Sequence, residues 1–110
     1  MYEPSRHYET FHIAGFQYYD GALVLNELNV GSTLDIVPEF DNPHDPNAIA
    51  LYFNNMKLGH IPRYINEPIA QMAYFGHTGA FECRVLQIDM TADPWEQVRV
   101  GLFFTDKRQR

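Results

Sequence analysis

The chain contains a single cysteine, Cys83, among its 110 residues. One thiol cannot form an internal disulfide, and it excludes a zinc site built from several cysteines of one chain. No stretch approaches the roughly 18 consecutive apolar residues of a membrane span. No charged segment followed by apolar residues opens the chain as a signal peptide would. These absences predict a cytoplasmic protein that makes no membrane contact.

Basic residues are scarce as well. Residues 1–105 carry 13 acidic and 5 basic side chains, a net charge of −8, and three further bases lie in residues 106–110. Proteins that bind long stretches of nucleic acid through its phosphates are usually basic. A wide phosphate-binding surface is therefore excluded, and any contact with nucleic acid has to be small and local.

The sequence also lacks the common catalytic signatures. It has no glycine-rich phosphate loop and no metal-ligand spacing of the H-x-x-x-H type. Ser5 and Ser32 do not lie in a nucleophile elbow. Cys83 alternates with Phe81 and Val85 on one strand face, where a cysteine usually serves as a small buried hydrophobe. We therefore predict a protein that is not an enzyme and has no cofactor.

A metal site is an alternative that the residues leave open. His44 and Asp45 precede one strand of a predicted hairpin and His60 lies on the other, so these side chains could converge near Asp41. A metal needs three or four such ligands in a fixed shell. The more ordinary interpretation is a hydrogen-bonded turn, in which Asp and Asn cap the backbone of their own loop. A metal-dependent, hydrolase-associated domain stays a minor alternative.

Aromatic residues are abundant, with 8 Phe, 7 Tyr and 1 Trp. Their rings favour strands over helices. Short, closely spaced strands interrupted by two short helices predict a mainly β domain, a small OB-like modified barrel. Strands are expected over 11–16, 33–40, 48–53, 57–61, 80–90 and 97–104, and helices over 22–28 and from an N-cap at Asn66 to Gly76. We expect an irregular N-terminal extension over 1–9, one domain over 10–105 and a charged tail over 106–110.

The segment from Asp41 to Ala48 combines two prolines with an acid, an imidazole and carboxamides. Pro43 and Pro46 fix their own φ angles and impose extended geometry on the residues before them. The loop is therefore stiff, and stiff polar loops on a β scaffold are common places for binding sites.

Two more pairs of side chains are candidates for binding. Tyr18 and Tyr19 end a predicted strand, so one ring is expected in the core and the other at the surface. An exposed ring could stack on a nucleobase, an interaction worth about 1–3 kcal/mol. His60 and Arg63 follow the hairpin and could bind one phosphate, although a solvated strand end is the more ordinary interpretation.

Three segments occur in a set order, with short helices after the first and the last. They are Gly-Phe-Gln-Tyr-Tyr at 15–19, Glu-Phe-Asp-Asn-Pro-His-Asp-Pro-Asn-Ala-Ile at 39–49 and Leu-Gly-His-Ile-Pro-Arg at 58–63. Over residues 10–104 the chain resembles the HIRAN domain family. The resemblance implies an OB-like barrel with helical insertions that binds the 3'-hydroxyl end of single-stranded DNA. It also implies a repair or remodelling context with a helicase or nuclease partner.

The resemblance assigns a role to each motif position. Tyr18 would stack on the terminal base, and His44 would take the place of a second ring. Asp45 would accept a hydrogen bond from the 3'-hydroxyl, and Asn42 would hold the loop or touch the terminal nucleotide. His60 and Arg63 would meet the phosphate behind it. Tyr19 completes the predicted site.

Two departures from the family pattern predict weak binding with a shallow salt dependence. Gln17 stands where a DNA-binding relative has an arginine, and His44 stands where it has a tyrosine. A second alternative is a protein-interaction or self-assembly module, and hence a homo-oligomer, that uses exposed rings such as Trp95 and Phe103 and has lost DNA binding.

Overall fold

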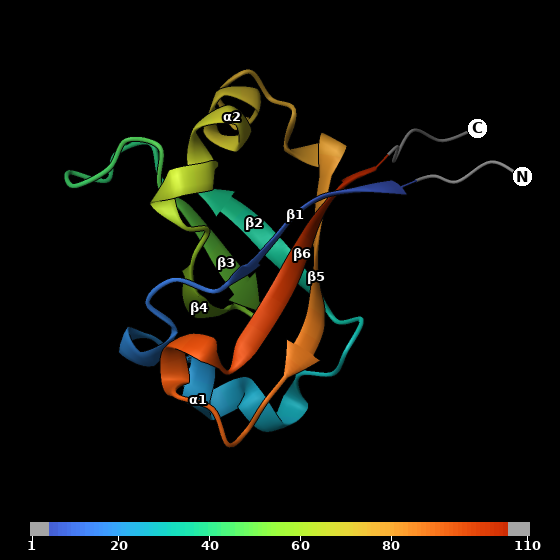
Figure 1. Cartoon of the computed structure of the whole chain (residues 1–110). Helices are drawn as coiled ribbons and strands as arrows, with labels where there is room; N and C mark the ends of the chain where they lie inside the picture. The colour runs from blue at the N-terminus through green and yellow to red at the C-terminus, as the bar shows by residue number, and fades with distance from the viewer. Residues whose placement is uncertain (1–4, 106–110) are drawn as a thin grey trace, which may run out of the picture.

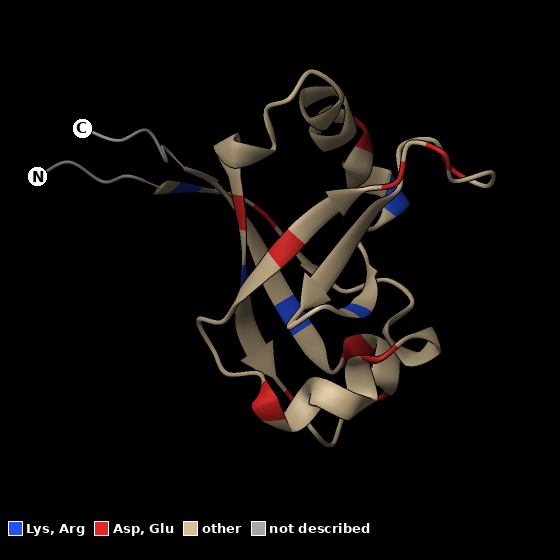
Figure 2. Cartoon of the chain, turned by 180° about the vertical axis from the view of Figure 1, so that it is seen from behind, with Lys and Arg blue, Asp and Glu red and all other residues tan. Residues whose placement is uncertain are grey.

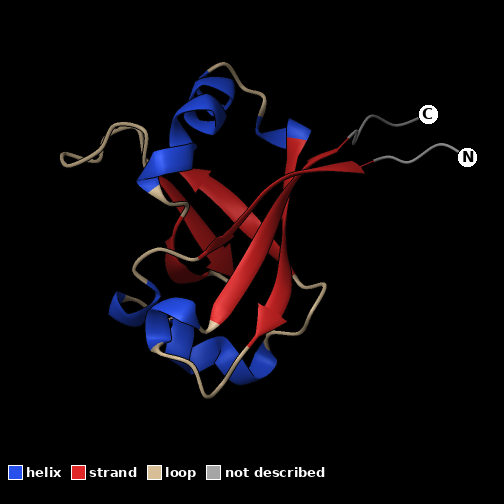
Figure 3. Ribbon diagram, in the orientation of Figure 1, coloured by secondary structure: helices blue, strands red, loops and turns tan. Residues whose placement is uncertain are grey.

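The computed structural model describes residues 5–105. The predicted charged tail over 106–110 and the start of the predicted N-terminal extension lie outside these residues. The described part contains two α-helices and six strands (Figures 1 and 3). The helices are α1 (Gly21–Val24) and α2 (Arg63–Tyr74). The strands are β1 (Ser5–His12), β2 (Thr33–Pro38), β3 (Ile49–Phe53), β4 (Met56–His60), β5 (Phe81–Ile88) and β6 (Val98–Thr105).

Short 3-10 helices complete the element order. They are η1 (Phe16–Tyr18), η2 (Leu25–Glu27), η3 (Thr78–Ala80) and η4 (Pro94–Glu96). In Figure 3 the helical elements gather at two opposite ends of the sheet, with α2 at one end and α1 at the other.

All six strands belong to one antiparallel sheet with the order β1-β6-β5-β2-β3-β4. A mainly β, OB-like domain with two short helices is therefore confirmed. The sheet does not close into a complete barrel. Ala14 and His60 form one isolated bridge, with two hydrogen bonds of 2.9 Å, between the chain after β1 and the end of β4. Directly after this bridge Gly15, at φ 72°, turns the chain into η1.

The core consists of the inward-facing side chains of the sheet, covered by residues of the helices. Cys83 belongs to this core, as predicted, and is fully buried. Burial raises the pKa of its thiol to about 12, so the thiol stays protonated and unreactive at neutral pH. The largest fully buried side chains are Ile13, Ile49, Leu51, Leu58, Ile61, Ile69 and Leu102.

The predicted irregular N-terminal stretch is wrong from Ser5 onward. β1 begins at Ser5 and pairs with β6 from Ser5–Thr105 to His12–Arg99, with a register shift between His7 and Glu9. Its residues are mostly polar, which conceals the strand in the sequence. An edge strand tolerates polar side chains because its stability comes from the backbone ladder with its neighbour.

The predicted start of the second helix is also wrong. α2 begins at Arg63, with Pro62 as its N-cap, so Asn66 lies within the helix and is only 3% exposed. The helix buries Ile69 and Ala73 against the sheet side of the core, whereas Met72 is exposed. The predicted hairpin is confirmed as β3 and β4, and its turn is made by Asn54 and Asn55, which both have positive φ, at 49° and 65°. Among residues 5–105 no helix is long and apolar enough to cross a membrane.

Candidate functional site

The loop between β2 and β3 projects from the body of the molecule (Figure 1). Glu39 N–H donates to the Ala48 carbonyl at 2.8 Å and closes the base of the loop. Within it, Asn42 N–H donates to the Glu39 carbonyl and Ala48 N–H to the Asp45 carbonyl, each at 3.0 Å. The loop is thus ordered by its own backbone as well as by its prolines.

The side chain of Asn42 holds this loop together. Its Oδ1 accepts hydrogen bonds from the backbone N–H of His44 at 2.8 Å and of Asp45 at 3.1 Å. Its Nδ2 donates to Glu39 Oε1 at 3.2 Å. Both lone-pair positions of the carbonyl oxygen are occupied, so Asn42 shapes the loop and has no free acceptor for a ligand.

Asp45 is the least exposed charged group at the tip of the loop, with 16% of its side chain accessible. Its Oδ1 accepts from Asn47 N–H at 2.9 Å, and its Oδ2 accepts from Asn66 Nδ2 at 3.0 Å. Arg63 Nε lies 3.5 Å from the same Oδ2. Burial disfavours the charge, but these hydrogen bonds and the nearby cation outweigh it and lower the pKa of Asp45. The group is a carboxylate at neutral pH.

The opposite wall of the site is formed by the chain after β1. Tyr18 N–H donates to the Gly15 carbonyl at 2.9 Å, and the Tyr18 ring is 78% exposed. Tyr19 is partly covered because its ring meets His60 edge-on, with centroids 5.5 Å apart. Lys57 Nζ lies 4.6 Å from the centroid of the Tyr19 ring. Tyr18 is thus the more exposed ring, and Tyr19, still 40% exposed, packs against His60. Both rings belong to η1 and its C-cap rather than to a strand, so the predicted core position for one of them is wrong.

All the predicted site residues line one pocket of about 330 Å³. They come from four places in the chain: the segment after β1, the β2–β3 loop, the end of β4 and the first residue of α2. They are Tyr18, Tyr19, Asn42, His44, Asp45, His60 and Arg63, and Ala14, Gly15, Ala48 and Ile61 complete the lining. The motif positions, which the sequence spreads over 46 residues from 18 to 63, thus converge in space.

The minor metal alternative finds no geometric basis in the described residues. Within residues 5–105 no three His, Cys, Asp or Glu side chains gather as ligands of one ion. His60 directs Nε2 at Glu39, and Asp45 is occupied by amide donors.

Two residues of the site were missed by sequence reasoning. Glu39 accepts hydrogen bonds from Lys57 Nζ at 2.7 Å, from His60 Nε2 at 2.7 Å and from Asn42. Burial opposes its charge, but these donors lower the pKa of Glu39 to about 2. Asn66, predicted as a helix cap, is the buried donor to Asp45. For Glu39 the available signal was its place in the motif at 39–49, whereas Asn66 lies outside the quoted motifs. Partners 18 and 21 residues away cannot be read from spacing.

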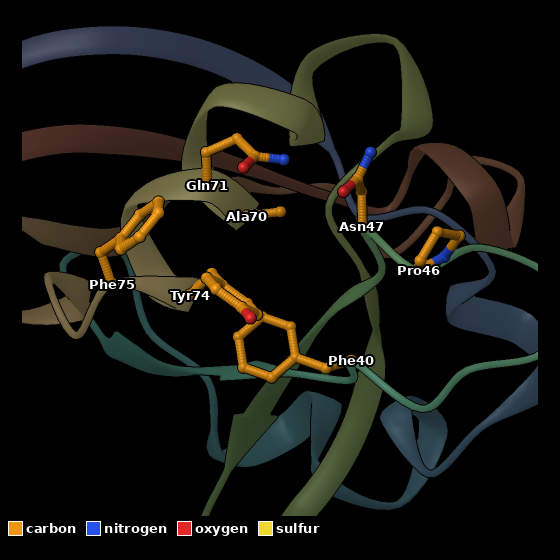
Figure 4. A pocket seen from close by; sticks show the side chains of 7 residues that line it. All are labelled: Phe40, Pro46, Asn47, Ala70, Gln71, Tyr74 and Phe75. Carbon is orange, nitrogen blue, oxygen red and sulfur yellow. The ribbon is translucent and has the colours of Figure 1, made fainter.

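A second pocket, of about 280 Å³, lies between the same loop and α2 (Figure 4). It contains none of the predicted site residues and no charged side chain. Its rings meet edge to face, with centroid distances of 5.6 Å for Phe40–Tyr74 and 5.2 Å for Tyr74–Phe75. The lining residues are Phe40, Pro46, Asn47, Ala70, Gln71, Tyr74 and Phe75.

The charges are distributed as the composition predicts. Figure 2 shows acidic residues on strands, helices and the projecting loop, with only short, separate basic segments on the described part of the chain.

Two aromatic rings were named for the self-assembly alternative. Trp95 is 52% exposed, whereas Phe103 is partly covered by the Arg84 guanidinium, 4.3 Å from the centroid of its ring.

The sequence matches the family model of the HIRAN domain over residues 9–101. The chain belongs to the HIRAN domain family. No curated protein matches it. Among solved structures it is similar to a protein from Lactobacillus plantarum, with 26% identity, a TM-score of 0.73 and coverage of 91% of this chain and 94% of that chain. It also shares its fold with the HIRAN domain of human HLTF, at 17% identity and a TM-score of 0.64, covering 94% of this chain and 83% of that chain.

Proposed function

We propose that this HIRAN domain is a non-enzymatic module that binds the end of a nucleic-acid strand, and that its ligand is the 3'-hydroxyl end of single-stranded DNA. HIRAN domains are nucleic-acid-binding modules rather than catalytic domains. The observation that carries the proposal is the carboxylate of Asp45, held ionised in a pocket that also contains an exposed ring and an arginine.

Asp45 suits a hydroxyl group. Oδ1 accepts one amide hydrogen bond and has a second lone-pair direction left, whereas Oδ2 accepts one and also has Arg63 Nε 3.5 Å away. A 3'-hydroxyl that donates to it would form a charge-assisted bond worth about 1.5–3 kcal/mol. A phosphate at the same position would place two anions together, so the residue also selects by rejection.

The exposed ring of Tyr18 suits the terminal base. It stands on one wall of the pocket, and the exposed imidazole of His44 belongs to the facing loop. A base between them would stack on Tyr18 for about 1–3 kcal/mol, and less on the smaller ring of His44. This stacking tolerates every base, so the site would not read sequence.

Arg63 suits the phosphate that follows the terminal nucleotide. Its side chain is 78% exposed, and its contacts with Asp45 and with the His44 carbonyl are both long, at 3.5 Å. The guanidinium is therefore free to turn toward a ligand. It lies in the first turn of α2, where the helix dipole also favours an anion. With so few cations, log Kd would change with log salt by about 0.7 per neutralised phosphate.

The module would contribute binding alone. Any remodelling or repair reaction would be carried out by a partner, either a helicase or a nuclease, that acts on the bound strand end. We place this activity in the cytoplasm. This separation of binding from catalysis agrees with the lining of the pocket, which contains binding groups but no nucleophile paired with a base.

Fluorescence anisotropy with single-stranded DNA labelled at its 5' end tests the proposal. Strands that end in a 3'-hydroxyl should bind more tightly than matched strands that end in a 3'-phosphate. Asp45→Asn should weaken binding of the hydroxyl end about 10- to 100-fold, the equivalent of about 1.5–3 kcal/mol. Asp41→Asn, an exposed position of the same loop, is the matched control. Equal binding of the 3'-hydroxyl and 3'-phosphate strands by the wild type would contradict the proposal. A matched RNA strand tests whether the site prefers DNA to RNA.

The aromatic pocket of Figure 4 favours a second candidate function, a protein-interaction or self-assembly module. Its exposed rings, Phe40, Tyr74 and Phe75, gather in an uncharged hollow, and apolar hollows of this kind are common at protein interfaces. Sedimentation velocity of the wild type and of Tyr74→Ala tests it. An oligomer that Tyr74→Ala dissociates would support this function, and a monomer at all concentrations would remove self-assembly.

A further inference from the structure

We propose that Asn66 is a positioning residue for the strand end, because its neutral amide holds the Asp45 carboxylate and thereby leaves Arg63 available for a phosphate. The inference rests on the proposed function and deepens it. Asn66 itself is not among the residues that line the pocket. Its influence on a ligand has to pass through Asp45, which does line it and to which its amide donates.

The first observation is the burial of Asn66. Among residues 5–105 it is the only polar residue that is buried, with 3% of its surface exposed. Asparagine is a poor helix former in a helix interior, and a buried amide is costly without a hydrogen-bond partner. The partner of its Nδ2 is Asp45 Oδ2, at 3.0 Å. A residue that breaks the local pattern of a helix in this way is typical of a functional site.

The second observation is that two donors of α2 approach the same oxygen of Asp45. Arg63 and Asn66 are three residues apart, so their side chains lie on one face of the helix. Asn66 Nδ2 is 3.0 Å from Oδ2, within hydrogen-bond distance, whereas Arg63 Nε is 3.5 Å from it. The other oxygen accepts from the backbone N–H of Asn47 at 2.9 Å. Two neutral donors therefore hold the carboxylate, and the guanidinium stays beside it, 78% exposed.

These contacts keep two opposite charges apart. Neutral donors orient Asp45 without cancelling its charge, so the carboxylate can accept from a hydroxyl and still repel a phosphate. Arg63, which is always protonated, can then meet the phosphate that follows the terminal nucleotide. Without the Asn66 amide, the guanidinium would close on Oδ2 as a tight ion pair. The rejection of a terminal phosphate and the contact with the following phosphate would weaken together.

Asn66→Leu tests this role in the full chain, because leucine has the branched shape of asparagine without its polar atoms. In anisotropy titrations it should lower the preference for the 3'-hydroxyl over the 3'-phosphate strand about tenfold, the loss of one hydrogen bond to a charged group. It should also lower the slope of log Kd against log salt for the hydroxyl strand by about 0.7, since Arg63 no longer reaches a phosphate. A buried, uncharged side chain that only supported the fold would leave this slope unchanged.

Gln71→Leu is the matched control, since it makes the same kind of change at an exposed position of α2 that lines the aromatic pocket. It should leave both the preference and the salt slope unaltered. Arg63→Gln, at an exposed side chain, should lower the salt slope by the same amount as Asn66→Leu. It should not lower the preference, because the loss of a cation does not favour a phosphate.

A spectroscopic measurement reports the predicted movement of Arg63. In NMR spectra of the ¹⁵N-labelled chain, Arg63→Gln identifies the Arg63 Nε–H signal. This hydrogen should exchange with water more slowly in Asn66→Leu than in the wild type, because it is then bound to Asp45.

The outcomes separate the two proposals. If the wild type binds neither strand or binds both equally, the proposed function fails and the role of Asn66 fails with it. If the wild type prefers the 3'-hydroxyl but Asn66→Leu keeps the same preference, only the role of Asn66 is overturned. A lower preference in Arg63→Gln also overturns it, because Arg63 would then be the residue that positions Asp45. If Asn66→Leu folds poorly, Asn66→Ala and Arg63→Gln decide by the same criteria.

Discussion

The β2–β3 loop has a different kind of pocket on each side. On one side Asn42, Asp45, His60 and Arg63 form a polar pocket in which most side chains already have a hydrogen-bond partner. On the other side, Phe40 and α2 form an uncharged pocket of aromatic rings. Both pockets are of similar size, at about 330 and 280 Å³. The two pockets differ in chemistry rather than in volume, because only the polar pocket is lined by charged side chains, Asp45 and Arg63.

The largest effect is expected at Gly59, next to His60 in the polar pocket. A Cβ there would lie 2.4 Å from the Ala14 carbonyl oxygen, and the residue has φ 151°. Gly59→Ala should therefore destabilise the fold by more than about 3 kcal/mol, through overpacking and backbone strain together. Chemical denaturation measures the loss. Gly79→Ala, where a Cβ meets no atom within 4 Å, is the control, and comparable losses in the two variants would refute this reasoning.

Lowering the pH should weaken the hydrogen bonds that hold the polar pocket together and leave the uncharged aromatic pocket unchanged. The pKa of Glu39 is lowered from 4.5 to about 2, so its contribution is complete above pH 4.5 and is lost as the pH falls toward 2. The contribution is up to about 3 kcal/mol. The free energy of unfolding, measured between pH 6 and 2, should fall less steeply in Glu39→Gln than in the wild type. Parallel curves would mean that Glu39 does not stabilise the fold.

Asn66 and Gln71 allow a direct comparison of two amides on α2. The Asn66 amide is buried and donates to Asp45, whereas Gln71 is exposed and lines the aromatic pocket. Asn66→Ala should cost about 2 kcal/mol of unfolding free energy because it removes a donor from a charged acceptor. Gln71→Ala should stay within about 0.5 kcal/mol of the wild type. Thermal unfolding of the two variants would show whether hydrogen bonding or packing holds α2 to the loop.

Tyr18 and Tyr74 allow the same comparison for binding. Their rings are similarly exposed, at 78% and 67%, and each belongs to a different pocket. Tyr18→Ala should weaken binding of a 3'-hydroxyl strand about tenfold, in the lower part of the range of about 1–3 kcal/mol for base stacking. Tyr74→Ala should leave it unchanged. If Tyr74→Ala weakened binding as strongly, the aromatic pocket would belong to the nucleic-acid site as well.

Local patterns predicted much of the fold. The alternation of Phe81, Cys83 and Val85 placed one face of β5 in the core, and the strands expected over 48–53 and 57–61 located the β3–β4 hairpin. Two elements were misplaced because contacts with other parts of the fold, and not the local sequence, define where they begin. β1 is a polar edge strand defined by its ladder with β6, and the N-terminal turn of α2 has no capping side chain that spacing could reveal.

The sequence by itself determined the family, the mainly β fold and the residues of the polar pocket. It did so because the stiff loop and the two segments beside it are local motifs. Only the tertiary structure decided the charge and the hydrogen-bond partners of those residues. Glu39 meets Lys57 and His60, and Asp45 meets Asn66, over separations of 18 to 21 residues. Sheet register and the packing of α2 set these contacts. They fix the hydrogen-bond partners of the Glu39 and Asp45 carboxylates and join Nε2 of His60 to Glu39, and spacing along the chain carries no such information.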